Sequence, residues 1–155
     1  MKFVALLFAL IFSSLASLAH ADPVKPGDIG IVDGDTITVR GNPHQVRLRG
    51  FDTPETGWGA RCSAERALAD KATQRLRDIV AAGGLDLAVI PCPCWRQKGY
   101  RACNDGRDCG VLKAKGRNVA DIMISEGLAR PLHCGKACPV EYSWCDRLNA
   151  APAMR

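Results

Sequence analysis

The sequence predicts an α+β fold that is mainly β: a small five-stranded barrel with two to three helices, stapled by disulfides. Three observations predict it. Short segments alternate apolar and polar residues between turn residues, one long segment has the apolar spacing of a helix, and eight cysteines stand in a chain of 155 residues. With 47% hydrophobic and 24% charged residues, the chain has the composition of a globular domain with a core.

Five segments have the pattern of strands. In the first half they are separated by the turn residues Asp33-Gly34 and Gly41-Asn42-Pro43, which predicts a meander or hairpin. The third alternates apolar Val46 and Leu48 with cationic Arg47 and Arg49, so it has one apolar and one basic face. The expected strands are 28–32, 36–40, 45–51, 85–90 and 110–114.

A helix is predicted over 64–82, with an apolar stripe that belongs to the core. Ser63 is its expected N-cap, and Gly83-Gly84 ends it. The stripe consists of Leu68, Ala72, Leu76, Ile79 and Val80. A second helix is expected over 119–126, with Val119, Ile122 and Met123 inward. From Pro131 onward we expect an irregular, cysteine-rich tail with Trp144 in its core.

Residues 1–21 have the order of a signal peptide. Lys2 precedes a mostly apolar run over 3–18, and Ala19-His20-Ala21 is a small-x-small cleavage site. The run is shorter than the roughly 20 apolar residues of a spanning helix. We therefore expect a mature chain of one domain, 22–155, that is exported to the periplasm or secreted. An uncleaved anchor is the alternative.

The cysteines of a short exported chain predict disulfide bonds. Zinc is the alternative, because Cys92-x-Cys94 and Cys134-x3-Cys138 could supply thiolates, but these spacings fit no common zinc knuckle. The tail holds three cysteines, so if all are paired, at least one must reach back to the rest of the domain. The eight are Cys62, Cys92, Cys94, Cys103, Cys109, Cys134, Cys138 and Cys145.

The formal net charge of +5 is concentrated in one window. Between Arg96 and Arg117, seven basic residues stand against only Asp105 and Asp108. A local excess of this kind suits a polyanionic partner, and a solvated loop is the alternative.

Acidic residues and one arginine gather at two predicted turns and strand ends. Asp33-Gly34-Asp35-Thr36 follows the first strand, and Asp52-Thr53-Pro54-Glu55 follows the strand that carries Arg47. Carboxylates are hard oxygen ligands for a divalent cation, and guanidinium groups neutralise phosphate. Together they predict cation-assisted chemistry on a phosphodiester.

These motifs, followed by a helix, then Gly106-Arg107 and then the segment 116–120, resemble the staphylococcal (thermo)nuclease family in the same order. The resemblance runs from about Ile31 to Ala129. It implies an oligonucleotide-binding (OB) barrel and a calcium-dependent, thermonuclease-like endonuclease. Such an enzyme acts on DNA and RNA and leaves 3′-phosphate ends. It also implies a monomer, with no membrane partner once the signal is removed.

The resemblance assigns roles by position. Asp35 and Asp52 would ligate one Ca²⁺ through their carboxylates, and Thr53 through its main-chain carbonyl. Glu55 would be the general base for the attacking water. Arg47 would bind the scissile phosphate, and Arg107 would stabilise charge as the leaving oxygen departs. Asp35, Arg47, Asp52 and Glu55 also lie in the acidic and basic motifs that the pattern alone singles out, whereas the roles of Thr53 and Arg107 rest on the resemblance.

The chain departs from the family pattern just before Gly106-Arg107. Asn104 and Asp105 stand where the type member has a lysine and a tyrosine, and an acid there should weaken nucleotide binding. The tyrosines that pack the base after the second helix are replaced near His133 and Gly135. Trp58, Tyr100 or Trp95 could stack on a base instead, or could be loop packing.

Two other functions remain as alternatives. One is a non-catalytic nucleic-acid-binding module on the same barrel, because fold alone does not fix function. The other is a disulfide-stapled interaction protein whose acidic loop binds calcium structurally. A pure binder has no need for Asp35, Asp52, Glu55, Arg47 and Arg107 together, and this favours the enzyme.

Overall fold

The computed structural model describes residues 21–90, 92, 103–132 and 143–150. The predicted signal segment lies outside this range except for Ala21, as do Trp95, Tyr100, His133 and Gly135. No described helix is long and apolar enough to cross a membrane.

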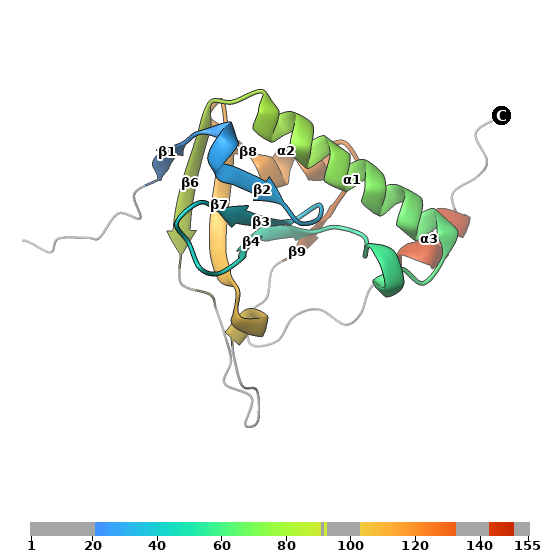
Figure 1. Cartoon of the computed structure of the whole chain (residues 1–155). Coiled ribbons are helices and arrows are strands. Elements are labelled where there is room, and N and C mark those ends of the chain that lie inside the picture. The colour runs from blue at the N-terminus through green and yellow to red at the C-terminus, as the bar shows by residue number, and fades with distance from the viewer. Residues whose placement is uncertain (1–20, 91, 93–102, 133–142, 151–155) are drawn as a thin grey trace, which may run out of the picture.

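The five predicted strands all contribute to one mixed sheet, shown in Figure 1. Within it β4 and β7 run parallel, whereas the other neighbouring strands run antiparallel. The strand order is β1-β6-β7-β4-β3-β2, with β8 paired to β7. The bounds are β1 Asp22–Val24, β2 Ile29–Ile31, β3 Thr36–Val39, β4 Val46–Leu48, β6 Leu85–Ile90, β7 Asp108–Ala114 and β8 Arg117–Asn118. With three helices, this is an α+β fold of the OB type, as expected.

The single strand expected over 45–51 is wrong at its end. Gly50 has a φ of 95°, a left-handed conformation that a non-glycine residue adopts only under strain. The chain therefore leaves the ladder after β4, and Gly50–Asp52 forms β5. This strand pairs with β9, Arg130–Leu132, in a separate two-stranded sheet. The break places Asp52 opposite Arg130.

Three α-helices cover the sheet and one end of the molecule: α1 Ser63–Ala81, α2 Val119–Ser125 and α3 Trp144–Ala150. Cys62, not Ser63 as predicted, is the N-cap of α1, and its sulfur accepts a hydrogen bond from the Glu65 backbone N–H. Gly83 and Gly84, both with positive φ, follow the helix as expected. Short 3-10 turns lie at η1 Pro26–Asp28, η2 Gly57–Gly59 and η3 Cys103–Gly106.

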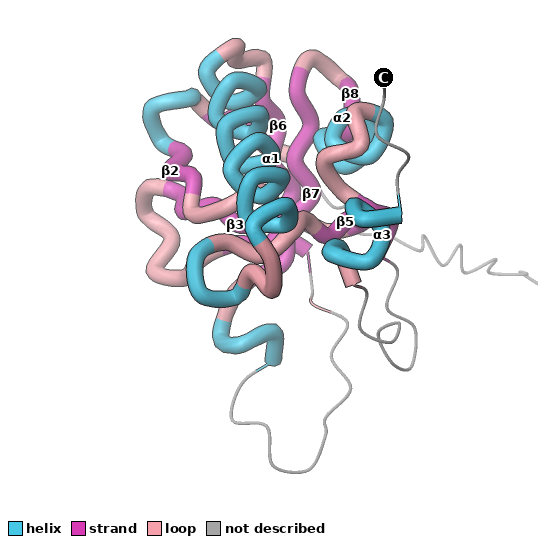
Figure 2. The backbone as a smooth tube through the Cα atoms, turned by 90° about the vertical axis from the view of Figure 1, so that its right-hand side faces the viewer, coloured by secondary structure: helices cyan, strands magenta, loops and turns pink. Residues whose placement is uncertain are grey.

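The expected irregular tail is also partly wrong, because α3 forms there and packs on α1 (Figure 2). Trp144, at its first position, is buried as predicted. A disulfide joins Cys62, the N-cap of α1, to Cys145 in α3. A cysteine of the tail therefore does pair with the rest of the domain. The disulfide at Cys145 and the packing on α1 hold this seven-residue helix in place.

A second disulfide joins Cys92 to Cys109 in β7, with the Cα atoms 5.2 Å apart. Four of the eight cysteines are thus in disulfides, as predicted, rather than in zinc sites. The side chains of the other four, Cys94, Cys103, Cys134 and Cys138, lie outside the described residues.

The core lies between α1, α2 and the concave side of the sheet. Four members of the predicted α1 stripe are in it, namely Ala72, Leu76, Ile79 and Val80, whereas Leu68 is only half-buried. The inward residues of α2, which are Val119, Ile122 and Met123, join them. From the strands, the core includes Ile37, Val46, Leu48 and Phe51.

Candidate active site

Asp35 lies in the turn between β2 and β3 and is buried, with 2% of its surface exposed. Its Oδ2 accepts two hydrogen bonds of 2.9 Å from Thr53, one from the backbone N–H and one from the hydroxyl. The Thr36 hydroxyl donates to Oδ1 at 3.2 Å. Removal from water raises the pKa of Asp35 from 3.8 to about 7, even though Arg47 and Thr53 act in the opposite direction.

The turn needs glycine at position 34. A Cβ there would lie 2.9 Å from side-chain atoms of Thr53 and 3.0 Å from the Cβ of Ala72, which is too close for any larger residue. The Asp-Gly-Asp sequence therefore lets the turn approach both the chain after β5 and helix α1. This approach is what brings the Asp35 carboxylate against Thr53.

Arg47 of β4 bridges the two acidic segments. Its Nη2 lies 2.9 Å from Asp35 Oδ2 and 2.8 Å from Asp52 Oδ1. Because both carboxylates contact the same nitrogen, their oxygens cannot be farther apart than the sum of these two distances. The predicted convergence of Asp35, Arg47, Asp52 and Thr53 is therefore present in the structure.

Asp52 has a second cationic partner, Arg130, which the sequence analysis did not identify. Arg130 in β9 contacts Asp52 Oδ2 through Nη2 at 2.8 Å and through Nε at 3.0 Å. The two strands place these residues opposite each other. The family resemblance ends one residue earlier, at Ala129. The sequence feature that could have pointed to Arg130 is a basic residue shortly after Gly127.

Glu55 lies three residues beyond Asp52, at the start of a loop over 55–62, and it is exposed. Its backbone N–H donates to Glu65 Oε1 at 3.4 Å. Its side chain lies against Gly59, where an added Cβ would be 3.2 Å from Glu55 Oε2. Glu55 is thus open to water. Only two residues, Thr53 and Pro54, separate it from Asp52 in the chain.

Arg107 shares an open hollow of about 190 Å³ with Arg47. The hollow is lined by Arg47, Leu48, Arg49, Gly50, Phe51, Asn104, Arg107 and Leu132. Two of the predicted phosphate-binding residues therefore line one space, and Arg49 is a third arginine on its wall. The half-buried Arg107 belongs to the short segment between η3 and β7.

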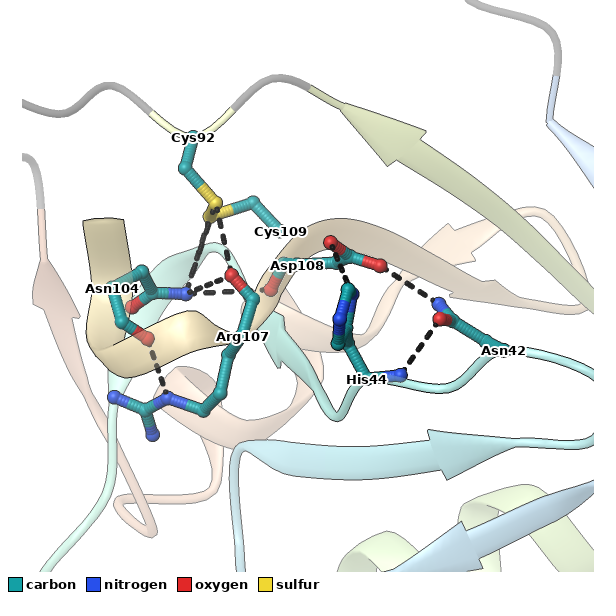
Figure 3. The surroundings of a disulfide bond; sticks show 7 residues. All are labelled: Asn42, His44, Cys92, Asn104, Arg107, Asp108 and Cys109. Carbon is teal, nitrogen blue, oxygen red and sulfur yellow. Dashed lines mark hydrogen bonds and ion pairs between the residues drawn. A yellow bond between two sulfur atoms is a disulfide. The ribbon is translucent and has the colours of Figure 1, made fainter. Parts of the chain in front are cut away.

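Asn104 holds Arg107 in place, as Figure 3 shows. The Arg107 backbone N–H and Nε donate to the Asn104 carbonyl at 3.0 and 3.1 Å. The Asn104 side-chain amide donates in turn to the carbonyls of Arg107 and Asp108, both at 3.3 Å. Asn104 has a φ of 52°, a conformation that asparagine tolerates better than most residues. The departure from the family pattern at this position thus has a structural role.

The Cys92–Cys109 disulfide lies directly beside this segment (Figure 3). Cys92 Sγ is 3.7 Å from the Arg107 carbonyl oxygen. On the next residue, Asp108 accepts a hydrogen bond of 2.9 Å from Asn42 in the β3–β4 turn. The disulfide and this contact fix the backbone that directly follows Arg107.

The donor set around Asp35 fits a hard divalent cation. Asp35 and Asp52 present carboxylate oxygens to a common point, now occupied by one cationic nitrogen of Arg47, and Thr53 follows Asp52 directly. Oxygen donors of this kind are those that Ca²⁺ prefers. The cluster of Cys62, Glu65 and Cys145 among the described residues is a different case, because both sulfurs are in the disulfide.

Two curated proteins of Bacillus subtilis (strain 168) are similar to this chain. It is 35% identical over 101 residues to SPbeta prophage-derived endonuclease YokF, and 33% identical over 101 residues to Endonuclease YncB. The similarity covers 64% of this chain in both cases, but 31% and 44% of the relatives. The chain thus spans less than half the length of either. No family model matches the sequence.

Proposed function

We propose that this protein is an exported, calcium-dependent phosphodiesterase, an endonuclease that hydrolyses DNA, RNA or both and leaves 3′-phosphate ends. One observation carries the proposal: Arg47 bridges Asp35 and Asp52 and shares a hollow with Arg107. Both similar proteins are named endonucleases, and this supports the same reaction class.

The reaction explains why basic groups line the hollow. Attack of water on a phosphodiester adds negative charge at a centre that is already anionic. Each of the two arginines that line the hollow has a guanidinium group that can donate two hydrogen bonds to phosphate oxygens. Arg47 would bind the phosphate in the ground state, and Arg107 would stabilise the charge that develops on the leaving oxygen. Loss of one such donor costs on the order of 10²–10³ in kcat.

Asp35, Asp52 and the main-chain carbonyl of Thr53 would hold the calcium ion. When bound, the ion polarises a phosphoryl oxygen and helps to orient the attacking water. The burial of Asp35, its hydrogen bonds from Thr53 and the ion pairs of both carboxylates with arginines support this assignment, because they hold the two carboxylates close together.

Glu55 would accept the proton of the attacking water. A general base must reach water and substrate, and the exposure of Glu55 permits both. The proton would go to one Glu55 carboxylate oxygen as the new P–O bond forms, and the 5′ oxygen of the next nucleotide would leave. A positioned base of this type contributes roughly 10²–10⁴ in rate.

The test is cleavage of single-stranded DNA, duplex DNA and RNA by the purified oxidised protein, with calcium and with excess chelator. We expect cleavage with calcium, none with chelator, and products whose 5′ ends accept phosphate from a polynucleotide kinase without prior dephosphorylation. Full activity in chelator would refute the metal mechanism. Binding without any cleavage would instead support the non-catalytic module.

Glu55→Ala is the variant that tests the base. We expect it to fold and to bind substrate, but to lose most cleavage. Asp121→Asn is the control, because Asp121 is an exposed acid in the first turn of α2 with no part in the proposed reaction. Unchanged turnover in Glu55→Ala would remove Glu55 from the base role.

Export is part of the proposal because both described disulfides need an oxidising compartment to form and persist. Expression of the full chain, followed by fractionation and N-terminal sequencing, tests it. The expected mature N-terminus is Asp22, the residue at which β1 begins. Recovery of the intact 155-residue chain in the cytoplasm would contradict it.

A further inference from the structure

Trp58 is completely exposed, at 103% of the reference surface of its residue type. It lies in η2, between Gly57 and Gly59. Among the described residues, the other large apolar side chains that are exposed are Val32 at 43% and Val89 at 55%. The indole therefore does not pack on its own loop, although loop packing was one of the two interpretations of this residue.

The loop that carries Trp58 is nevertheless held by hydrogen bonds at both ends and in the middle. The backbone N–H groups of Glu55 and Arg61 donate to the two carboxylate oxygens of Glu65, at 3.4 and 2.8 Å. Arg66 Nη2 donates to the Gly57 carbonyl at 3.2 Å. All these contacts lead to α1, so the exposed ring is presented by an anchored backbone.

The ring of Trp58 lies close in the chain to Glu55, the proposed general base. Trp58 lies in a turn closed by a hydrogen bond of 3.1 Å from the Gly59 N–H to the Thr56 carbonyl, and Glu55 directly precedes this turn. The Glu55 side chain lies against Gly59, the residue after Trp58. A nucleotide whose phosphodiester lies at Glu55 thus has an aromatic surface beside it.

We propose that Trp58 is a nucleotide-binding residue that stacks on an unpaired base next to the cleaved phosphodiester. A large apolar ring left in water on an anchored loop gains free energy when a flat apolar group covers it. Every nucleobase offers such a face, so stacking tolerates any sequence. A base inside a duplex already has both faces covered, and the site therefore favours single strands or frayed ends.

This inference rests on the proposed function, because that function makes the ligand a nucleic acid. It does not depend on whether the protein cleaves that ligand. The binding test is therefore made without hydrolysis. Every protein carries Glu55→Ala, calcium is present, and the probes are a mixed-sequence single-stranded DNA oligonucleotide and the same sequence as a duplex. The variants are Trp58→Ala and Trp58→Phe. Val89→Ala is the matched control, because it also removes an exposed apolar side chain.

Base–aromatic stacking of about 1–3 kcal/mol per base predicts a Kd about 5- to 150-fold higher for the single strand in Trp58→Ala. Trp58→Phe should lose less, Val89→Ala should bind like the parent, and duplex affinity should change much less. Equal single-strand Kd values for Trp58→Ala and the parent would overturn the inference. So would equal losses for single strand and duplex, which would indicate a general surface effect.

The same variants with Glu55 restored separate this inference from the proposed function. If the native protein cleaves and Trp58→Ala raises KM for single strands with little change in kcat, both stand. If the native protein cleaves and KM is unchanged, only the stacking role fails. If the native protein binds the single strand through Trp58 but never cleaves it, only the nuclease proposal fails.

Discussion

The buried carboxylate of Glu65 accepts a hydrogen bond from the backbone N–H of Glu55, so one acid of helix α1 positions another acid at the surface. Its second oxygen accepts from the Arg61 N–H at 2.8 Å, and Cys145 Sγ lies 3.5 Å from the same oxygen. The Glu65 side chain therefore connects three segments: the loop with Glu55 and Trp58, the start of α1, and helix α3.

Glu65→Ala should destabilise the fold and slow the proposed reaction. The variant leaves two backbone N–H groups beside a buried cavity without their acceptor, at a cost on the order of 1–3 kcal/mol. Urea unfolding measures that loss. We also expect kcat to fall more than KM rises, because Glu55 loses its fixed position while the hollow with Arg47 and Arg107 is untouched.

Gln74→Ala is the control for Glu65→Ala, since Gln74 is an exposed residue of the same helix whose amide contacts only Asp78 and Arg77 in the described structure. It should change the free energy of unfolding by less than about 0.5 kcal/mol. Equal unfolding midpoints for the two variants would contradict the role given to Glu65.

Arg130→Met should cost more stability than Arg40→Met, although both arginines have ion pairs of similar length. Arg130 and Asp52 are each 17% exposed, whereas Arg40 is 76% exposed in its pair with Asp28. Hydrogen bonds to a half-buried charge are worth about 1.5–3 kcal/mol, and an exposed pair about 0–1 kcal/mol. Chemical denaturation of both variants decides this, and equal losses would count against a structural role for Arg130.

Removal of the Cys62–Cys145 disulfide should destabilise the protein more than removal of Cys92–Cys109. The first closes a loop with a sequence separation of 83, the second one of 17. Loop-closure entropy gives roughly 4.7 kcal/mol for about 100 residues and roughly 3 kcal/mol for about 15. The double serine variants, compared by thermal unfolding, measure both. A larger loss for Cys92–Cys109 would show that local strain or packing outweighs chain entropy.

The sequence predicted those parts of the structure that short-range patterns determine. Helix α1 has 19 residues with a regular apolar stripe and glycines at its end, so its own residues are sufficient to identify it. The Asp35, Arg47 and Asp52 cluster followed from two motifs at strand ends. The cap of α1 was missed because Ser63 has the more usual capping side chain, whereas Cys62 is placed by its disulfide.

The parts that were missed depend on contacts distant in the sequence. Strand β9 has three residues, too few for a periodic pattern, and it forms because β5 leaves the main sheet at Gly50. The Asp52–Arg130 pair follows from that pairing across 78 residues. Helix α3 has only seven residues, and the Cys62–Cys145 bond ties it to the start of α1. Cysteine parity predicted that a tail cysteine pairs with the rest of the domain, but not which one.

The stability of the protein without divalent cations should fall as the pH rises from about 4 to about 7. Burial raises the folded-state pKa of Asp35 to about 7 from 3.8, so between these values the folded state binds a proton that the unfolded state has lost. This contribution is fully present below pH 3.8 and lost above about 7, with a slope of at most about 1.4 kcal/mol per pH unit.

Asp35→Asn removes this titration, so its unfolding free energy in chelator should change less over the same pH window. For the native protein, calcium affinity should rise as the pH approaches and passes 7, because the ion must displace the proton from Asp35. Calorimetric titration with calcium at several pH values measures it. A calcium affinity independent of pH from 5 to 8 would exclude Asp35 as a ligand.

Arg47→Lys should lower kcat by about 10²–10³, while Arg49→Lys should cost less than about tenfold. Both arginines line the hollow, but only Arg47 also contacts Asp35 and Asp52. Lysine keeps the positive charge and loses the planar fork that can hold a carboxylate and a phosphate at once. Single-turnover cleavage with saturating enzyme separates this loss from weaker binding. If both variants lost activity equally, positive charge in the hollow would be the requirement, and the bridge between the two carboxylates would have no separate part in the chemistry.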